Sequence, residues 1–362
     1  MKKKLLTGGN SLNRRDKKVE FNRIRILIPI WLLITLIHSI SAQQLPAINH
    51  YFLNTYIVNP AYAGNSGYTD VMALYRKQWV GVPGAPETSL LTADWGLKSE
   101  KAGLGLTFIN DRTNIISRNT GYGSFSYRVN LSQFQRLYFG LSLGFVNTMI
   151  DFDKIRAKDP TESTLFQYPD QKILPDGNVG IAYQFKSFRA GFSVMQLFQN
   201  DAQFKDQYDA KALSYGLIRH FNLLMEYSYN INDRFRISPM VLLKSVQGMN
   251  PTGEACATVY YVKKYWLSVN YRLRDALGFT GGFILDNRFA LSYSYELPSF
   301  SALNVISYGS HEVALKFRFV GASGRAKTGY EFIDNSINYV DEGVSEEEKA
   351  KNAKPLPKKG KK

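Results

Sequence analysis

Histidine, serine and acidic side chains are the first candidates for chemistry in this sequence, because together they build metal sites and hydrolytic triads. The histidines after residue 42 are His50, His220 and His311, and none has a metal-ligand spacing such as HExxH. Ser310, His311 and Glu312 supply the residue types of a triad in consecutive positions. In an extended strand Ser310 and Glu312 share one face while His311 points away, so adjacency does not assemble a triad. We expect a structural motif here, and no catalytic residue.

Cysteine and glycine point to no cofactor either. The single cysteine, Cys256, excludes an intramolecular disulfide, a cysteine-cluster zinc site and a CxxC redox motif. Gly103 and Gly105 resemble a phosphate loop only superficially, because they alternate with leucines and no helix follows. We expect these two glycines to make room on the lumen face of a strand or to permit strand curvature, and we expect no cofactor or metal.

Charge and composition narrow the class of protein. The 362 residues include 45 Lys and Arg against 30 Asp and Glu, a net charge of +15. Nine of these basic residues lie in residues 1–42. The excess positive charge in the remainder of the chain is therefore too dilute for the clustered basic surface that binds nucleic acid. Aromatic residues make up 14% of the chain, which excludes disorder for its middle part.

The N-terminal 42 residues have the pattern of a secretory signal peptide. A basic stretch is followed by an apolar run at 26–37 and by small residues up to Ala42. Cleavage after Ala42 would leave Gln43 as the mature terminus. A retained helical anchor is the alternative, but about a dozen apolar residues interrupted by Pro29 are too few for a full span. We expect an exported chain.

From residue 70 to residue 320 the sequence alternates with period two, which predicts strands with one apolar and one polar face. In residues 288–297 the apolar positions are Phe289, Leu291, Tyr293, Tyr295 and Leu297. The polar face carries many charges, so we expect it to be wet. The predicted strands span 70–80, 88–98, 101–110, 117–131, 135–150, 177–186, 188–197, 213–231, 234–245, 253–262, 265–274, 277–285, 288–297 and 310–319.

The connections alternate between short turns and longer loops. The longer ones are 81–87, 111–116, 151–176, 198–212, 246–252 and 298–309. This asymmetry is typical of an outer-membrane barrel, which has short periplasmic turns and longer surface loops. A soluble propeller or sandwich is the alternative, but it would need small apolar residues in a dry core rather than faces rich in Tyr and Phe. We predict an all-β fold, a transmembrane antiparallel outer-membrane β-barrel of about 14 strands.

Two flanking segments complete the predicted organisation of signal peptide (1–42), N-terminal segment, barrel (70–320) and tail. Residues 43–69 are turn-rich and are predicted to precede the barrel in the periplasm. Residues 321–362 are rich in Lys and Glu and are predicted to form a flexible periplasmic tail. An even strand count places both termini in the periplasm.

The segment around Trp79 is richer than a barrel strand requires. Trp79 is followed by Gly84 and Pro86, which shape a loop. Trp79 could anchor the barrel rim at the membrane interface, or the loop could be a docking site on a rigid scaffold. The residue types alone leave both interpretations open.

Six segments in order make the sequence resemble the PorP/SprF family of the type IX secretion system of Bacteroidota. They are Asn59-Pro60-Ala61-Tyr62-Ala63-Gly64, Tyr75-Arg76-Lys77-Gln78-Trp79 with Gly84-Ala85-Pro86, Pro175-Asp176-Gly177-Asn178-Val179-Gly180, Asn270-Tyr271-Arg272, Ser292-Tyr293-Ser294-Tyr295 and Ser307-Tyr308-Gly309-Ser310-His311-Glu312. They cover about residues 43–320. The basic lead and the charged tail are longer than the family pattern requires.

The resemblance implies a non-enzymatic outer-membrane protein of secretion and gliding motility, which supports secretion or surface retention of large proteins with a C-terminal sorting domain. It also implies contacts with peptidoglycan-linked secretion components, besides outer-membrane lipid. We expect cargo at loops 81–87, 151–176 and 198–212, and periplasmic partners at the two flanking segments. The candidate partner-binding residues are Trp79, Phe166, Tyr168, Asn59, Pro60 and Tyr62, and the candidate structural residues are Gly64, Gly84, Pro86, Ser310, His311 and Glu312.

A passive channel for small solutes is the alternative function. Six basic residues are predicted to face the lumen and could favour anions. They are Arg234, Arg236, Arg272, Arg274, Lys316 and Arg318. Pairing of these residues with acidic side chains in a plugged lumen is the simpler expectation.

Overall fold

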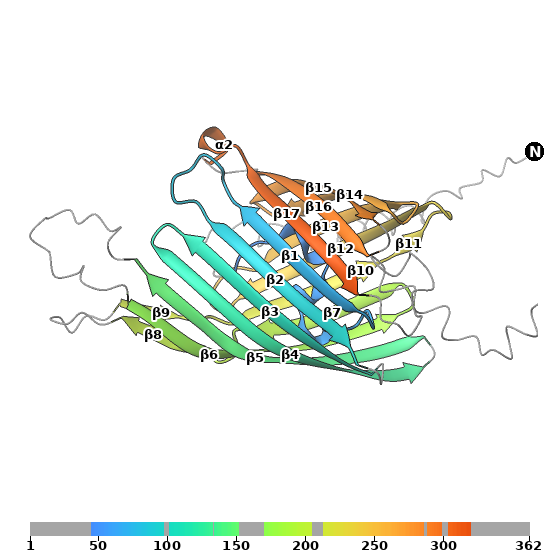
Figure 1. Ribbon diagram of the computed structural model, residues 1–362, viewed down its shortest axis with the longest axis horizontal. Coiled ribbons are helices and arrows are strands. Elements are labelled where there is room, and N and C mark those ends of the chain that lie inside the picture. The colour runs from blue at the N-terminus through green and yellow to red at the C-terminus, as the bar shows by residue number, and fades with distance from the viewer. Residues whose placement is uncertain are drawn as a thin grey trace, which may run out of the picture. The chain divides into compact units, whose positions relative to one another are not determined.

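The computed structural model describes residues 45–97, 101–132, 134–151, 170–204, 213–285, 288–298 and 303–319, which form a closed antiparallel barrel of 14 strands (Figure 1). The strands are β1 (Thr69–Lys77), β2 (Glu87–Gly96), β3 (Ala102–Thr113), β4 (Ile116–Ser132), β5 (Gln135–Ile150), β6 (Asp170–Phe185), β7 (Phe188–Met195), β10 (His220–Tyr227) with its continuation β11 (Tyr229–Asn230), β12 (Phe235–Val246), β13 (Thr252–Tyr261), β14 (Tyr265–Arg272), β15 (Ala276–Leu285), β16 (Phe289–Pro298) and β17 (Ser310–Phe319). Pairing of β1 with β17 and of β10 with both β7 and β12 closes the barrel.

The predicted strand number and the predicted alternation of faces are confirmed. In β17, Glu312, Lys316 and Arg318 point inward and are buried, whereas Val313 and Phe317 are exposed on the outer face. The barrel therefore has an apolar outside and a polar inside, as a membrane-spanning barrel requires. One end of the barrel carries the connections β2–β3, β4–β5, β6–β7, β11–β12, β13–β14 and β15–β16, and we call it the turn end. We call the opposite end the loop end.

Three predicted segments differ from the structure. The predicted strand 213–231 is split into β9 (Leu213–Gly216) and the barrel strand β10, and β9 pairs with β8 (Asp201–Phe204) in a separate two-stranded sheet. Strand β6 begins at Asp170, which shortens the predicted loop 151–176. The predicted loop 111–116 is a tight turn, because β3 and β4 pair as far as Thr113 and Ile116.

The N-terminal segment lies inside the barrel, where it forms three short 3-10 helices (Figure 1). They are η1 (Asn49–Phe52), η2 (Thr55–Ile57) and η3 (Pro60–Tyr62), and all are buried except for Ile57, which is half-buried. Asn54 and Asn59 cap η2 and η3 by accepting hydrogen bonds from the backbone N–H of Tyr56 and Ala61. We call residues 47–64 the plug. The expectation that residues 43–69 lie in the periplasm ahead of the barrel is corrected for the plug, which lies inside the barrel.

One further helix is described, α2 (Leu303–Ile306), in the connection between β16 and β17. Within the described residues, no helix has the length and hydrophobicity needed to cross a membrane. Residues 1–42 and 321–362, to which the sequence assigns the signal peptide and the tail, lie outside the described residues.

Candidate functional site

The carboxylate of Glu312 holds the first turn of the plug. It accepts hydrogen bonds from the backbone N–H groups of Asn49 and His50 at 3.0–3.1 Å, and His50 Nδ1 lies 2.6 Å from Glu312 Oε1. The side chains of His50 and Glu312 are both fully buried. An anion that receives several N–H donors stabilises a turn whose backbone groups have no other partners.

His50 also completes a Ser–His–Glu arrangement, because its Nε2 lies 2.8 Å from Ser292 Oγ. Ser292 Oγ also donates to the carbonyl of Gly281 at 3.1 Å. The arrangement is unsuited to hydrolysis, because the serine is buried and displacement of the plug would remove His50 from it.

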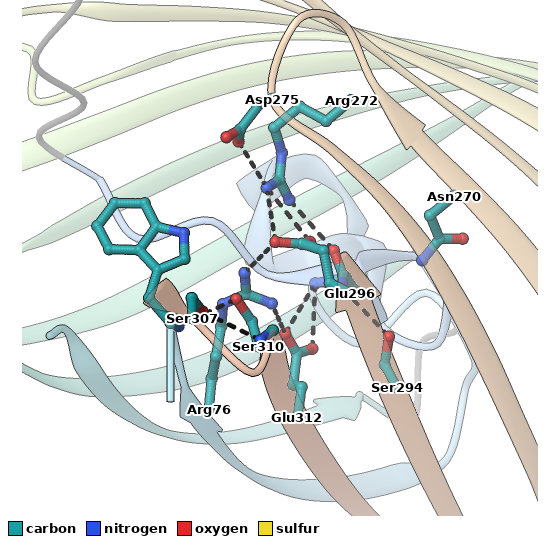
Figure 2. Close-up of polar contacts among 12 residues, drawn as sticks. Arg76, Asn270, Arg272, Asp275, Ser294, Glu296, Ser307, Ser310 and Glu312 are labelled. Carbon is teal, nitrogen blue, oxygen red and sulfur yellow. Dashed lines mark hydrogen bonds and ion pairs between the residues drawn. The ribbon is translucent and has the colours of Figure 1, made fainter. Parts of the chain in front are cut away.

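A network of buried ion pairs extends from Glu312 around the loop end of the lumen (Figure 2). Arg76 donates to Glu312 Oε2 at 3.0 Å and to Glu296 Oε1 at 2.7 Å. Arg272 pairs with Glu296 at 3.3 Å and with Glu254 at 3.2 Å, and donates to Asn49 Oδ1 in the plug at 3.1 Å. Buried charges of this kind are tolerated only when they are paired and hydrogen-bonded.

A second group of charges holds the plug at the turn end. Arg318 donates two hydrogen bonds of 2.6 Å to the two oxygens of Asp70. Lys316 pairs with Asp70 at 3.2 Å and donates to the carbonyl of Leu53 at 3.1 Å. Asp94 accepts from the backbone N–H of Gly64 at 3.0 Å. The plug is therefore anchored at both ends of the lumen.

These contacts correct the expectation of a wet inner face, because the inward charges are paired rather than solvated. The pairing of Arg272, Lys316 and Arg318 with acidic residues is confirmed. Arg236 is buried with its guanidinium 4.3 Å from the centre of the Tyr260 ring. The assignment of two other arginines to the lumen is wrong: Arg234 and Arg274 are exposed in the connections between strands.

Glycines on the inner face of the wall make room for the plug. A Cβ atom on Gly140 would lie 2.2 Å from the backbone nitrogen of Ala61, and one on Gly180 would lie 2.0 Å from Asn59 Oδ1. At Gly103 it would lie 2.2 Å from the carbonyl of Ala63, and at Gly105 2.6 Å from the Tyr56 ring. The predicted space-making role of Gly103 and Gly105 is confirmed, and the wall is complementary in shape to the plug.

We expect Gly140→Ala to unseat the plug, because the new methyl group has no space between β5 and η3. Overpacking of this kind costs about 1–3 kcal/mol. Hydrogen exchange followed by mass spectrometry should show faster exchange in the peptide that contains Asn49 and His50. Gly123→Ala on the outer face is the control, because its nearest contact is 4.0 Å away. Equal exchange in the two variants would contradict the role of Gly140.

The tyrosines of the plug act as neutral groups. Burial raises the pKa of Tyr51, Tyr56 and Tyr62 above the ordinary tyrosine value, so all three remain protonated at physiological pH. The Tyr56 hydroxyl lies 2.7 Å from Ser124 Oγ. Their contribution is packing rather than charge, and Tyr56 adds this hydrogen bond.

The motif predicted at the start of the last strand has the expected geometry. Ser310 and Glu312 are buried on the inner face, and Ser310 Oγ accepts from the backbone N–H of Trp79 at 3.3 Å. His311 points outward, with Nδ1 2.7 Å from the Tyr293 hydroxyl. All three residues take part in hydrogen bonds.

The other predicted residues are distributed over the plug and the loop end. Asn59, Pro60 and Tyr62 are buried in η3, which does not fit a partner-binding role. Gly64 and Gly84 adopt the left-handed backbone conformation, with φ of 62° and 71°. Trp79 is half-buried at the loop end, and Pro86 closes the same loop by accepting from Gln78 N–H at 2.9 Å. Phe166 and Tyr168 lie outside the described residues.

Sequence reasoning missed His50, Arg76 and Glu296 as members of the lumen network. One signal was available, because Arg76 and Glu312 fall on inward positions of strands that the closed barrel places side by side, and they are direct partners in the register. The contact of His50 with Glu312 could not be inferred, because it depends on the folding of the plug into the lumen. Among the described residues, no group of three or more His, Cys, Asp or Glu side chains could hold a metal ion.

The closed barrel, its apolar outer face and its filled polar interior define an outer-membrane β-barrel protein. The model of the family "Type IX secretion system membrane protein PorP/SprF" matches residues 40–317. The chain therefore belongs to the PorP/SprF family, and its role is that of an outer-membrane protein of type IX secretion.

Solved structures give only distant likenesses. A FadL homologue of Pseudomonas aeruginosa is 11% identical with a TM-score of 0.43, covering 76% of this chain and 95% of its own. The CymD monoaromatic hydrocarbon channel is 11% identical with a TM-score of 0.43, covering 78% and 95%. Omp33 of Acinetobacter baumannii is 7% identical with a TM-score of 0.42, covering 70% and 100%. No curated protein matches the chain.

Proposed function

We propose that this protein is a non-enzymatic scaffold of type IX secretion and gliding motility, which retains large surface proteins through their C-terminal sorting domain. The observation that carries the proposal is the filled lumen. Glu312, Arg272 and Lys316 of the wall all bind the plug, so the inner surface is occupied by the protein's own chain. A barrel whose interior is engaged in this way has its outer rim available for partners.

The loop end provides a rigid apolar surface for such a partner. The loop 78–86 and the described part of the next loop, 303–309, are joined by two backbone hydrogen bonds of 2.8 Å, from Val80 N–H to Gly309 O and from Tyr308 N–H to Val80 O. Tyr308 and Val305 are 75% and 88% exposed. Exposed aromatic and aliphatic side chains on a fixed backbone have the character of interface anchors.

The remaining assignments belong to the same proposal. We place the loop end at the cell surface and both termini in the periplasm, after removal of a signal peptide at Ala42. The tail at 321–362 is proposed to contact peptidoglycan-linked secretion components. Since Asn59, Pro60 and Tyr62 are buried, Trp79 is the partner-binding residue that we retain among those described.

Affinity purification from gently solubilised outer membrane, with mass spectrometry of the bound proteins, tests the proposal. We expect a very large surface protein and periplasmic secretion components to be recovered with the barrel. Recovery of the barrel alone, from a preparation in which other membrane complexes stay intact, would favour the alternative of a small-solute channel. Steady anion-selective conductance in planar bilayers would support that alternative directly.

We expect Trp79→Ala to leave the barrel folded and to weaken retention of the cargo at the cell surface. Truncation of a central interface anchor costs about 2 kcal/mol or more, which is roughly a thirtyfold loss of affinity. The measurement is the fraction of cargo on washed cells against that in the medium. Tyr229→Ala, a change at an exposed aromatic residue of the turn end, is the control. Normal retention by a folded Trp79→Ala variant would exclude Trp79 as an anchor.

A further inference from the structure

Four basic residues lie in three successive connections at the turn end, β11–β12, β13–β14 and β15–β16. Arg234, Lys264 and Arg288 are exposed, and Lys263 is half-buried. Backbone hydrogen bonds hold their turns against neighbouring strands, from Val262 N–H to Arg234 O at 2.7 Å and from Ile284 N–H to Lys264 O at 2.8 Å. The four cations therefore come from three successive turns of one sector of the barrel. We call them the basic patch.

Basic residues outnumber acidic residues in these three turns. Asp233 is the one acidic residue among the described residues of the turns, and the sequence adds Asp286. At the loop end of the same sector the charges are mixed, since Arg274 is followed by Asp275, which pairs with Arg272 at 3.0 Å. The sector is thus basic at its turn end alone.

A belt of outward-facing aromatic residues lies next to the basic patch on the same strands. Phe235 and Tyr261 are neighbours in the register of β12 and β13, with ring centres 4.9 Å apart. Phe317 and Phe319 of β17 have ring centres 4.7 Å apart, and Phe289 lies opposite Phe317. Outward aromatic rings at strand ends are the side chains that contact lipid at the level of the headgroups.

We propose that this sector binds anionic phospholipid, with the phosphate between the cations of the basic patch and the acyl chains over the aromatic belt. Cations just beyond a membrane interface attract anionic headgroups, and the belt is continuous with the apolar outer face. An acidic protein would satisfy the charges but not the adjacent belt, which lies where the barrel meets lipid. This inference is independent of the cargo proposed above.

Native mass spectrometry of the barrel in nanodiscs of phosphatidylcholine and phosphatidylglycerol tests the proposal. We expect the wild-type protein to retain phosphatidylglycerol preferentially. Loss of one cation should reduce the preference for phosphatidylglycerol over phosphatidylcholine roughly fivefold. The double variant Lys264→Gln, Arg288→Gln should therefore reduce it by about tenfold or more. The control is Arg112→Gln, Arg274→Gln, which removes two exposed cations from the loop end.

Three outcomes would overturn the proposal. The first is an unchanged phosphatidylglycerol preference in a folded Lys264→Gln, Arg288→Gln variant. The second is an equal loss in the control variant, since this would show that net charge alone attracts the lipid. Absence of any preference in the wild-type protein would also overturn it and would point to an acidic protein as the partner of the basic patch.

Discussion

Replacement of Arg76 by alanine is expected to cost about 3–5 kcal/mol of the free energy of unfolding, the range for removing one partner of a buried ion pair. Arg76 donates to both Glu312 and Glu296, and its side chain is 1% exposed. Without it, two buried carboxylates lose a cation that water cannot replace. The measurement is urea-induced unfolding of the barrel in lipid vesicles, followed by tryptophan fluorescence.

The neighbouring residue provides the control for this prediction. Lys77 pairs with Glu87 at 2.9 Å, but both side chains are well exposed. Exposed pairs contribute little because water competes for both charges, so Lys77→Ala should leave the unfolding midpoint unchanged. If Arg76→Ala and Lys77→Ala behaved alike, the lumen network would not contribute to stability in the way that we infer.

The barrel itself was predictable from the sequence because the alternation of apolar and polar residues within each strand shows which side chains point outward and which point inward. In β17 the alternation of Val313 and Phe317 with Glu312 and Lys316 follows from a two-residue period, and this period is a local property. The predicted strand 213–231 failed for the opposite reason. Both halves of this segment have sequences that favour strands. The pairing of β9 with β8, outside the barrel sheet, depends on tertiary structure and cannot be inferred from the local sequence.

The plug could not be predicted in the same way. Residues 47–64 have turn-forming residues and caps, which specify local bends but not the surface against which they pack. Contacts such as that of Asn49 with Glu312 join residues 263 positions apart. A signal was nevertheless present in the wall, because Gly140 and Gly180 interrupt inward positions where a large side chain would otherwise fill the lumen. Such a pattern indicates that another segment approaches the wall closely.

Deletion of residues 47–63 is expected to convert a silent barrel into a conducting one. Barrels of eight strands are filled by their own side chains, whereas those of 16–18 leave an aqueous channel. A wall of 14 strands lies nearer the second case, and its inward glycines leave further space. Once the plug is absent, water should enter and solvate charges such as Arg272 and Lys316. Single-channel recording in planar bilayers is the measurement.

Two controls make the result of this deletion interpretable. Heat-modifiable migration on gels shows whether the deleted barrel still folds, and Gly140→Ala in the full chain should give partial, flickering conductance without any deletion. A synthetic peptide of residues 45–66 added to the deleted barrel should close it again, because the Glu312, Arg272 and Lys316 contacts are available to it. A folded but silent deletion variant would show that the wall alone fills the lumen. In that case the plug would stabilise the barrel without sealing it.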